Sequence, residues 1–191
     1  MHEKLLQQAM EMFDSQEKWD AFLELCNNVK GNIINRWLNA LKDEIKRLYG
    51  LSLTTTNKWE IIDDKWSWIR IYTRPLSDDM DFRINLENRT GYLFLNLNKY
   101  DMMTARQMIL NNSKLMSLLE GFEYNNTLWG VVLIKPFAKD ISSHSWESSC
   151  YIWGHDTERV AKVLFETYIQ PFMTDEIADF IVKVCEESKK Q

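Results

Sequence analysis

The stretch that decides the fold is Trp66–Arg74, whose sequence WSWIRIYTR alternates with a period of two. Such alternation predicts a β-strand, because successive side chains of a strand point to opposite faces of its sheet. One face would carry the small and aliphatic side chains Ser67, Ile69, Ile71 and Thr73. The other face would carry the aromatic and arginine side chains Trp66, Trp68, Arg70, Tyr72 and Arg74. The first set suits a hydrophobic core, whereas aromatic residues and arginine dominate the energetics of binding surfaces.

The segments around this strand predict an antiparallel sheet. Alternating runs lie at residues 59–62, 82–87 and 92–98, and Asn88–Gly91 has the composition of a hairpin turn. Leu128–Ile134 is apolar on both faces, as in a central strand covered on both sides, and Ser149–Trp153 is predicted to be a further strand. We therefore expect an α+β fold, with an antiparallel or mixed sheet of about four to five strands flanked by helices.

The N-terminal segment, residues 1–50, has helical spacing instead. Apolar stripes predict one helix over Leu5–Phe13, a second after it, and a long third helix over Ile33–Leu48. Asn27 and Asn28 mark a break or weak point in this region, and we expect an N-terminal helical hairpin beside the sheet. No linker is apparent, so residues 1–191 are predicted to form a single domain, with the sheet and its helices in residues 51–191.

Further helices are expected in the C-terminal half. Stripes over Met108–Leu119, Val160–Tyr168 and Ile177–Val184 predict one central and two C-terminal helices, the last capped by Thr174. Three tryptophans lie on apolar stripes and are expected in the core, namely Trp19, Trp37 and Trp129.

Composition and charge narrow the class of partner. The 45% hydrophobic and 27% charged residues are typical of a globular protein. The net charge of −5 counts against general nucleic-acid binding and suits a basic protein partner. No run of about 18 apolar residues predicts a membrane span, and no signal-peptide pattern is present. Cys26, Cys150 and Cys185 have no disulfide or zinc spacing, so we expect a cytoplasmic protein in a reducing compartment.

One cluster of reactive side chains comprises His144, Cys150, His155 and Asp156. A zinc site or a Cys/His pair is conceivable, but the spacing lacks the close ligand pairs of structural zinc. Asp156 has a simpler role as the N-cap of the following helix. A loop, a strand and a cap explain these residues.

A second cluster comprises Asp81, Glu87 and Arg89. It resembles part of a metal-dependent nuclease pattern, but both acids bracket one strand and arginine stands where lysine is usual. The sequence therefore predicts no catalytic residue, no metal ligand and no cofactor.

The aromatic and arginine face of the Trp66–Arg74 strand has two open interpretations. It either binds a partner or lies beneath a second helical layer. In the first case Arg70→Ala and Tyr72→Ala would weaken binding, and in the second they would lower stability.

Three segments, Phe13–Leu25, Ile33–Trp37 and Leu41–Lys42, resemble a loose group of uncharacterised bacterial proteins. Some of these are labelled as similar to the PD-(D/E)XK nuclease superfamily. The likeness is strongest over residues 13–42 and rests on helix caps and core aromatics, and the acidic and lysine signature of the superfamily is not intact. The resemblance implies a mixed sheet flanked by helices and a nuclease fold that has lost its chemistry.

These features favour a non-enzymatic protein-interaction module, such as an immunity, antitoxin or defence-associated protein that binds and neutralises a partner. The alternative is a divergent metal-dependent nuclease. The oligomeric state is left open by the sequence.

Overall fold

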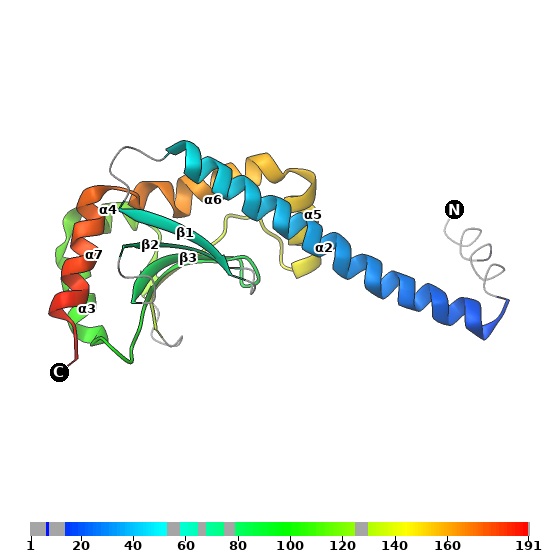
Figure 1. The fold of residues 1–191 in the computed structure, drawn as a ribbon, viewed down its shortest axis with the longest axis horizontal. Coiled ribbons are helices and arrows are strands. Elements are labelled where there is room, and N and C mark those ends of the chain that lie inside the picture. The colour runs from blue at the N-terminus through cyan, green and yellow to red at the C-terminus, as the bar shows by residue number, and fades with distance from the viewer. Residues whose placement is uncertain are drawn as a thin grey trace.

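The fold is one antiparallel sheet with helices before, within and after it in the chain (Figure 1). The computed structural model describes residue 7 and residues 14–52, 58–64, 68–74, 79–124 and 130–190. In chain order the elements are α2 (Gln16–Ser52), β1 (Trp59–Asp64), β2 (Trp68–Thr73), β3 (Met80–Asn85), β4 (Thr90–Leu95), α3 (Met102–Asn111), α4 (Ser113–Leu118), β5 (Glu123–Tyr124), β6 (Val131–Pro136), α5 (Trp146–His155), α6 (Thr157–Tyr168), the 3₁₀ helix η1 (Gln170–Phe172) and α7 (Asp175–Glu187). The expected α+β class is confirmed, and the sheet has six strands, slightly more than expected.

The strands lie in the order β1-β2-β3-β4-β6-β5, and every neighbouring pair is antiparallel. The first four strands follow one another as a meander, and β6 then lies between β4 and β5. The predicted hairpin joins β3 to β4, and Arg89 in its turn has a φ of 54°. The sheet begins at Trp59, after the helical segment, as the change in periodicity predicts.

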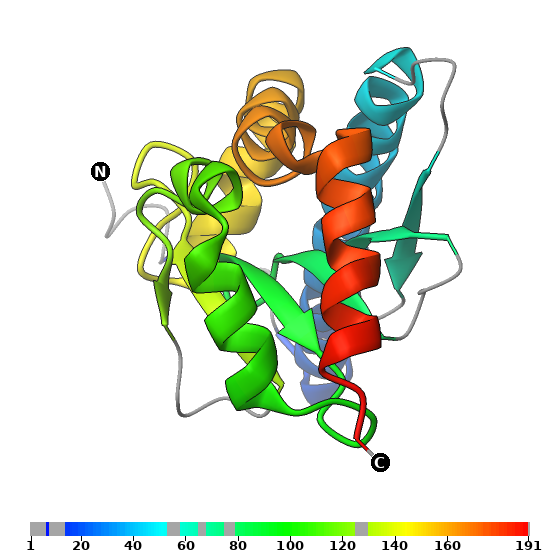
Figure 2. The ribbon, with the colours of Figure 1, turned by 90° about the vertical axis from the view of Figure 1, so that its left-hand side faces the viewer.

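Helices cover one face of the sheet. Ile69 and Ile71 of β2 point to this face and are fully buried, as their place in the alternating pattern predicts. Phe82 of β3 stacks on Phe172 of η1, with 4.1 Å between the ring centroids. Helices α2, α5 and α6 lie on this side in Figure 1, and Figure 2 shows α3 beside α7 at one end of the sheet.

Helix α2 is one continuous helix of 37 residues. Its C-terminal half packs on α5 and α6, whereas its N-terminal half projects beyond the other elements (Figure 1). The predicted break at Asn27 and Asn28 is wrong, because asparagine in a helix interior costs only about 0.7 kcal/mol relative to alanine. The described residues thus form one long helix where two successive helices were expected. The first arm of that hairpin, residues 1–13, lies outside the described residues apart from residue 7.

The strand predicted over Ser149–Trp153 is wrong, because these residues belong to helix α5. Ser145 caps this helix by accepting a hydrogen bond from the backbone N–H of Ser148 at 3.1 Å. Cys150 and Trp153, three residues apart, are both fully buried, so the apolar residues of this segment follow the spacing of a helix and not the alternation of a strand.

Two other helix predictions are refined by the structure. Met108–Leu119, predicted as one helix, is divided between α3 and α4 at Asn112, whose side chain accepts a hydrogen bond from the backbone N–H of Leu115 at 2.9 Å. The C-terminal helix α7 begins as predicted, with Thr174 as its N-cap.

The packing of α6 on the sheet is tested by Gly91 of β4. A Cβ at this position would come within 2.1 Å of the Tyr168 ring, so Gly91→Ala is expected to lower the free energy of unfolding by about 1–3 kcal/mol. Gly50→Ala is the matched control, since among the described residues such a Cβ would have no heavy atom within 4 Å apart from its chain neighbours and the backbone of its own stretch of helix. Alanine is the better helix former, and the control should gain about 0.5–1 kcal/mol. Urea unfolding measures both, and equal effects would contradict the contact.

Candidate functional site

The predicted binding residues lie on the sheet face that points away from the helices. Trp68, Arg70 and Tyr72 project from this side of β2, and Arg74 directly follows the strand. Trp66 lies outside the described residues. Within the described part of the chain no helix packs on this side of the sheet (Figure 1). We call this surface the open face and define it by Glu60, Ile62, Trp68, Arg70, Tyr72, Arg74, Asp81, Arg83 and Phe94.

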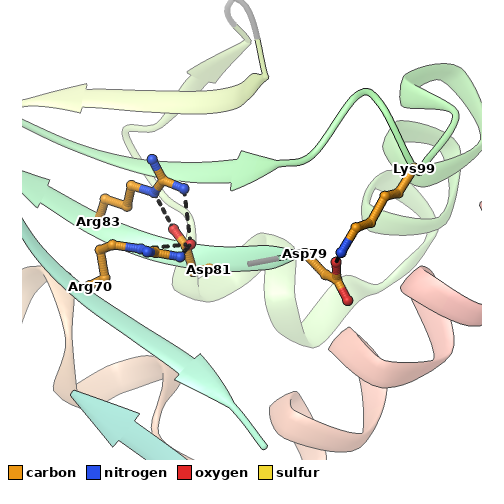
Figure 3. Close-up of polar contacts among 5 residues, drawn as sticks. All are labelled: Arg70, Asp79, Asp81, Arg83 and Lys99. Atoms are coloured by element: carbon orange, nitrogen blue, oxygen red, sulfur yellow. Dashed lines mark hydrogen bonds and ion pairs between the residues drawn. The ribbon is translucent and has the colours of Figure 1, made fainter. Parts of the chain in front are cut away.

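The centre of the open face is an ion network around Asp81 of β3 (Figure 3). Arg70 and Arg83 lie directly opposite each other in the sheet register, and like charges in this arrangement destabilise a sheet. The carboxylate of Asp81 lies between the two guanidiniums. It accepts hydrogen bonds from Arg70 Nη2 at 2.7 Å and Nε at 3.1 Å, from Arg83 Nη2 at 3.0 Å, and from Arg83 Nε. The acid thus places one negative charge between the two positive ones and offsets their repulsion.

This network is almost closed to solvent. The side chain of Asp81 is 0% exposed, and those of Arg83 and Arg70 are 9% and 14% exposed. Burial raises the pKa of the Asp81 carboxyl, while the hydrogen bonds and charge of Arg83, together with the charge of Arg70, act in the opposite direction. A buried triad of this kind requires all its members, because removing one leaves an uncompensated charge.

The Arg83 guanidinium also contacts the aromatic side chains of the open face. It lies over the ring of Phe94, 3.6 Å from the ring centroid, and 5.3 Å from that of Trp68. Both distances are within the range of cation–π attraction. Asp81 therefore holds Arg83, and Arg83 in turn holds the partly exposed Trp68 in place.

A second, smaller group of contacts surrounds Glu60 of β1. Its carboxylate accepts hydrogen bonds from the hydroxyl of Tyr72 at 2.6 Å and from Nε of Arg74. Burial and the hydrogen bond to Glu60 raise the pKa of Tyr72 to about 12. The hydrogen bond from Tyr72 also holds the pKa of Glu60 below its ordinary value.

The predicted binding residues therefore divide into two groups. Tyr72 is buried and Arg70 nearly so, and both are engaged with carboxylates on neighbouring strands. Trp68 is partly exposed, the side chain of Arg74 at the other end of β2 is 61% exposed, and Ile62, opposite Arg70 on β1, is 42% exposed. Only the second group is available to a partner in this conformation.

Sequence reasoning missed the acids that organise this surface. In β3 the alternation of Asp81, Arg83 and Asn85 with Phe82 and Ile84 places an acid and a base on one face. That pattern was a usable signal. The strand register, which brings Arg70 opposite Arg83, could not be deduced from it.

The arrangement of acids differs from a two-metal or nuclease site. Asp81 is engaged by two guanidiniums, and Glu87 is an exposed residue beyond the other end of β3, roughly 15–20 Å along the chain. Among the described residues, no group of three or more His, Cys, Asp or Glu side chains could hold a metal ion.

The cluster near α5 is also poorly arranged for nucleophilic catalysis. Burial raises the pKa of the Cys150 thiol to about 11, so it stays protonated at neutral pH, and the thiol is a weak nucleophile. His155 stacks on Tyr151 at the surface, with 3.9 Å between the ring centroids. Asp156 precedes α6 as predicted, but its carboxylate pairs with Arg159 and does not cap the helix.

A second surface was not anticipated from the sequence. Trp19, predicted to be in the core, is 43% exposed on the projecting half of α2, so that prediction is wrong. Trp37 is half-buried against α5, and Trp129 lies outside the described residues. A groove of about 440 Å³ lies between α2 and α5. Cys26, Ile33 and Trp37 line it from α2, and Tyr151 lines it from α5.

Comparison of the chain with protein-family models, with curated proteins and with solved structures finds no match. None of the described helices is both long and apolar enough to cross a membrane.

The ion network predicts that substitution of Asp81 lowers the free energy of unfolding far more than substitution of Asp79, two residues before it. Asp81→Asn removes the charge that holds two buried guanidiniums and is expected to cost about 3–5 kcal/mol of unfolding free energy. Asp79→Asn is the comparison, since Asp79, itself 16% exposed, pairs with Lys99, whose side chain is 52% exposed to water, so this change should cost less than Asp81→Asn (Figure 3). Chemical denaturation of both variants measures the difference. A cost below about 1 kcal/mol for Asp81→Asn would contradict the structural role of the network.

Proposed function

We propose that this protein is a non-enzymatic interaction module that binds a protein partner through the exposed part of the open face. The supporting observation is Trp68, a partly exposed tryptophan held against Arg83, which is itself fixed by the buried Asp81. Interfaces gain most of their affinity from a few aromatic and arginine residues, and a side chain that is already ordered loses little entropy on binding. Arg74 and Ile62 extend this surface with a charge and an apolar contact.

The net charge of −5 favours a basic partner, since opposite charge steers association and suppresses binding to acidic proteins. A protein that acts by binding and neutralising its partner needs such a rigid surface and no catalytic group. An immunity, antitoxin or defence role in a bacterial cytoplasm fits these properties and forms part of the proposal. The alternative is a divergent metal-dependent nuclease, as the resemblance described above implies. Asp81 does not support it, because its carboxylate already accepts hydrogen bonds from two arginines.

The proposal predicts that Trp68→Ala weakens partner binding without unfolding the protein. We expect a loss of about 1–3 kcal/mol in affinity, or roughly 5- to 150-fold in dissociation constant, because a preordered aromatic contact is removed. Met103→Ala is the control, since Met103 is 70% exposed on α3, away from the open face, and should bind as the wild type does. Affinity capture identifies the partner, and isothermal calorimetry then measures each variant against it.

Two outcomes would count against the proposal. A partner bound equally well by the wild type and the Trp68→Ala variant would place the binding site elsewhere. Hydrolysis of DNA or RNA with Mg²⁺ or Mn²⁺ that is lost on Glu87→Gln would establish the nuclease alternative, because that exposed acid can be changed without disturbing the buried network.

A further inference from the structure

The sheet has one long edge, formed by β1. This strand is the last of the sheet on its side, whereas the strand at the opposite edge, β5, has only two residues. All six residues of β1 pair with β2 in a continuous register, without the bulge, proline or lysine by which edge strands avoid pairing with other chains. Figure 1 shows β1 in front of β2 and β3, with no other described element across it. An edge of this kind can accept an added strand.

The hydrogen-bond ladder shows which backbone groups of β1 face outward. The N–H of Arg74 donates to the carbonyl of Lys58 at 3.1 Å, so these two residues form a hydrogen-bonded pair. Hydrogen-bonded pairs alternate along an antiparallel ladder. Trp59, Ile61 and Asp63 therefore direct their N–H and C=O groups away from β2, toward the edge of the sheet.

Helix α2 closes this edge at its first position only. The hydroxyl of Tyr49 donates a hydrogen bond to the outward carbonyl of Trp59 at 2.7 Å. At the next outward position, Ile61, no hydrogen bond from another described residue reaches the backbone N–H or C=O. The edge is thus available to a further chain from Ile61 toward Asp63.

Charge counts against a second copy of this chain as the added strand. β1 contains Glu60, Asp63 and Asp64 and no basic residue, and Arg74 offsets only the charge of Glu60. Two copies of β1 can pair antiparallel through the outward groups of Ile61 and Asp63. In that register Glu60 of each copy lies directly opposite Asp64 of the other, and like charges so placed destabilise a sheet. A strand that carries lysine or arginine has the complementary charge.

We propose that the protein partner contributes a basic strand that pairs with the outer edge of β1. This inference rests on the proposed binding role of the open face, because the added strand would extend that face beyond Ile62. The strand lies about 4.8 Å from β1 and exchanges backbone hydrogen bonds with Ile61 and Asp63. Its lysine or arginine side chains are attracted by the acidic edge, which guides the strand to β1.

Amide hydrogen exchange in the wild-type protein tests the edge directly. The amide of Ile61 should exchange at least about tenfold faster than that of Ile62, whose N–H faces β2. A synthetic peptide of alternating lysine and valine, about eight residues long and at millimolar concentration, should then slow exchange at Ile61. The same peptide with glutamate in place of lysine, or with alternate amides methylated, should not.

Two results of this experiment would overturn the proposal. The first is an Ile61 amide that the lysine peptide leaves unprotected. The second is protection of Ile61 that grows with the concentration of the protein alone, because a second copy of the chain would then occupy the edge.

Two substitutions at one position isolate the backbone contribution. Ile61→Pro removes the outward N–H and its ring obstructs an added strand, whereas Ile61→Ala shortens the side chain and keeps the N–H. Both variants should fold, because this N–H does not bond to β2. Calorimetry should give a dissociation constant for the lysine peptide at least about tenfold higher for Ile61→Pro than for Ile61→Ala. Equal affinities would overturn the proposal.

Two further variants test the charge and separate this inference from the proposed function. Asp64→Asn should raise the dissociation constant of the lysine peptide roughly two- to fivefold, and Asp20→Asn, on the projecting half of α2, should leave it unchanged. Equal effects would overturn the choice of a basic strand. A protein partner that is weakened by Trp68→Ala but leaves the Ile61 amide unprotected would overturn strand addition and support the open face. A partner that protects Ile61 and binds the Trp68→Ala variant equally well would have the opposite meaning.

Discussion

The carboxylate of Asp81, buried between two guanidiniums, is the interaction on which the second face of the sheet depends. Among the described elements, helices cover only one face of the sheet. The apolar side chains of the strands, such as Ile69 and Ile71, point to that face and form the core. The other face has no described helix to exclude water from it. Its side chains exclude water themselves, through one acid that compensates Arg70 and Arg83. Without that acid, two like charges would face each other across β2 and β3.

This constraint also decides what the open face can do. A carboxylate held by two arginines has no lone pairs directed at solvent for a metal ion, and Tyr72 is similarly committed to Glu60. The residues that stay accessible, Trp68 and Arg74, are those that supply contact area and a hydrogen-bonding tip. The engaged acids and the accessible Trp68 are the observations that support the proposed role in recognition.

The sequence predicted the two faces of β2 because alternation depends only on local geometry. It did not predict the network, because the partners of Arg70 come from β3 and their meeting depends on the register between strands. The error at Trp19 has a related cause. An apolar stripe shows that one side of a helix is hydrophobic. It does not show whether that side packs against the rest of the same chain. The short apolar run at Ser149–Trp153 fits both the period of a strand and that of a helix. Ser145, which caps the helix, is the signal that distinguishes the two.

The central claim is that the open face is closed in its interior and accessible at its edge. Hydroxyl-radical footprinting with residue-level mass spectrometry measures this directly. Trp68 and Ile62 should be oxidised in the folded protein, while Tyr72, which is 6% exposed, and Phe82, which is 3% exposed, should be protected until the chain unfolds. Oxidation of Tyr72 in the folded protein as readily as Trp68 would contradict the account, because the face would then be open throughout.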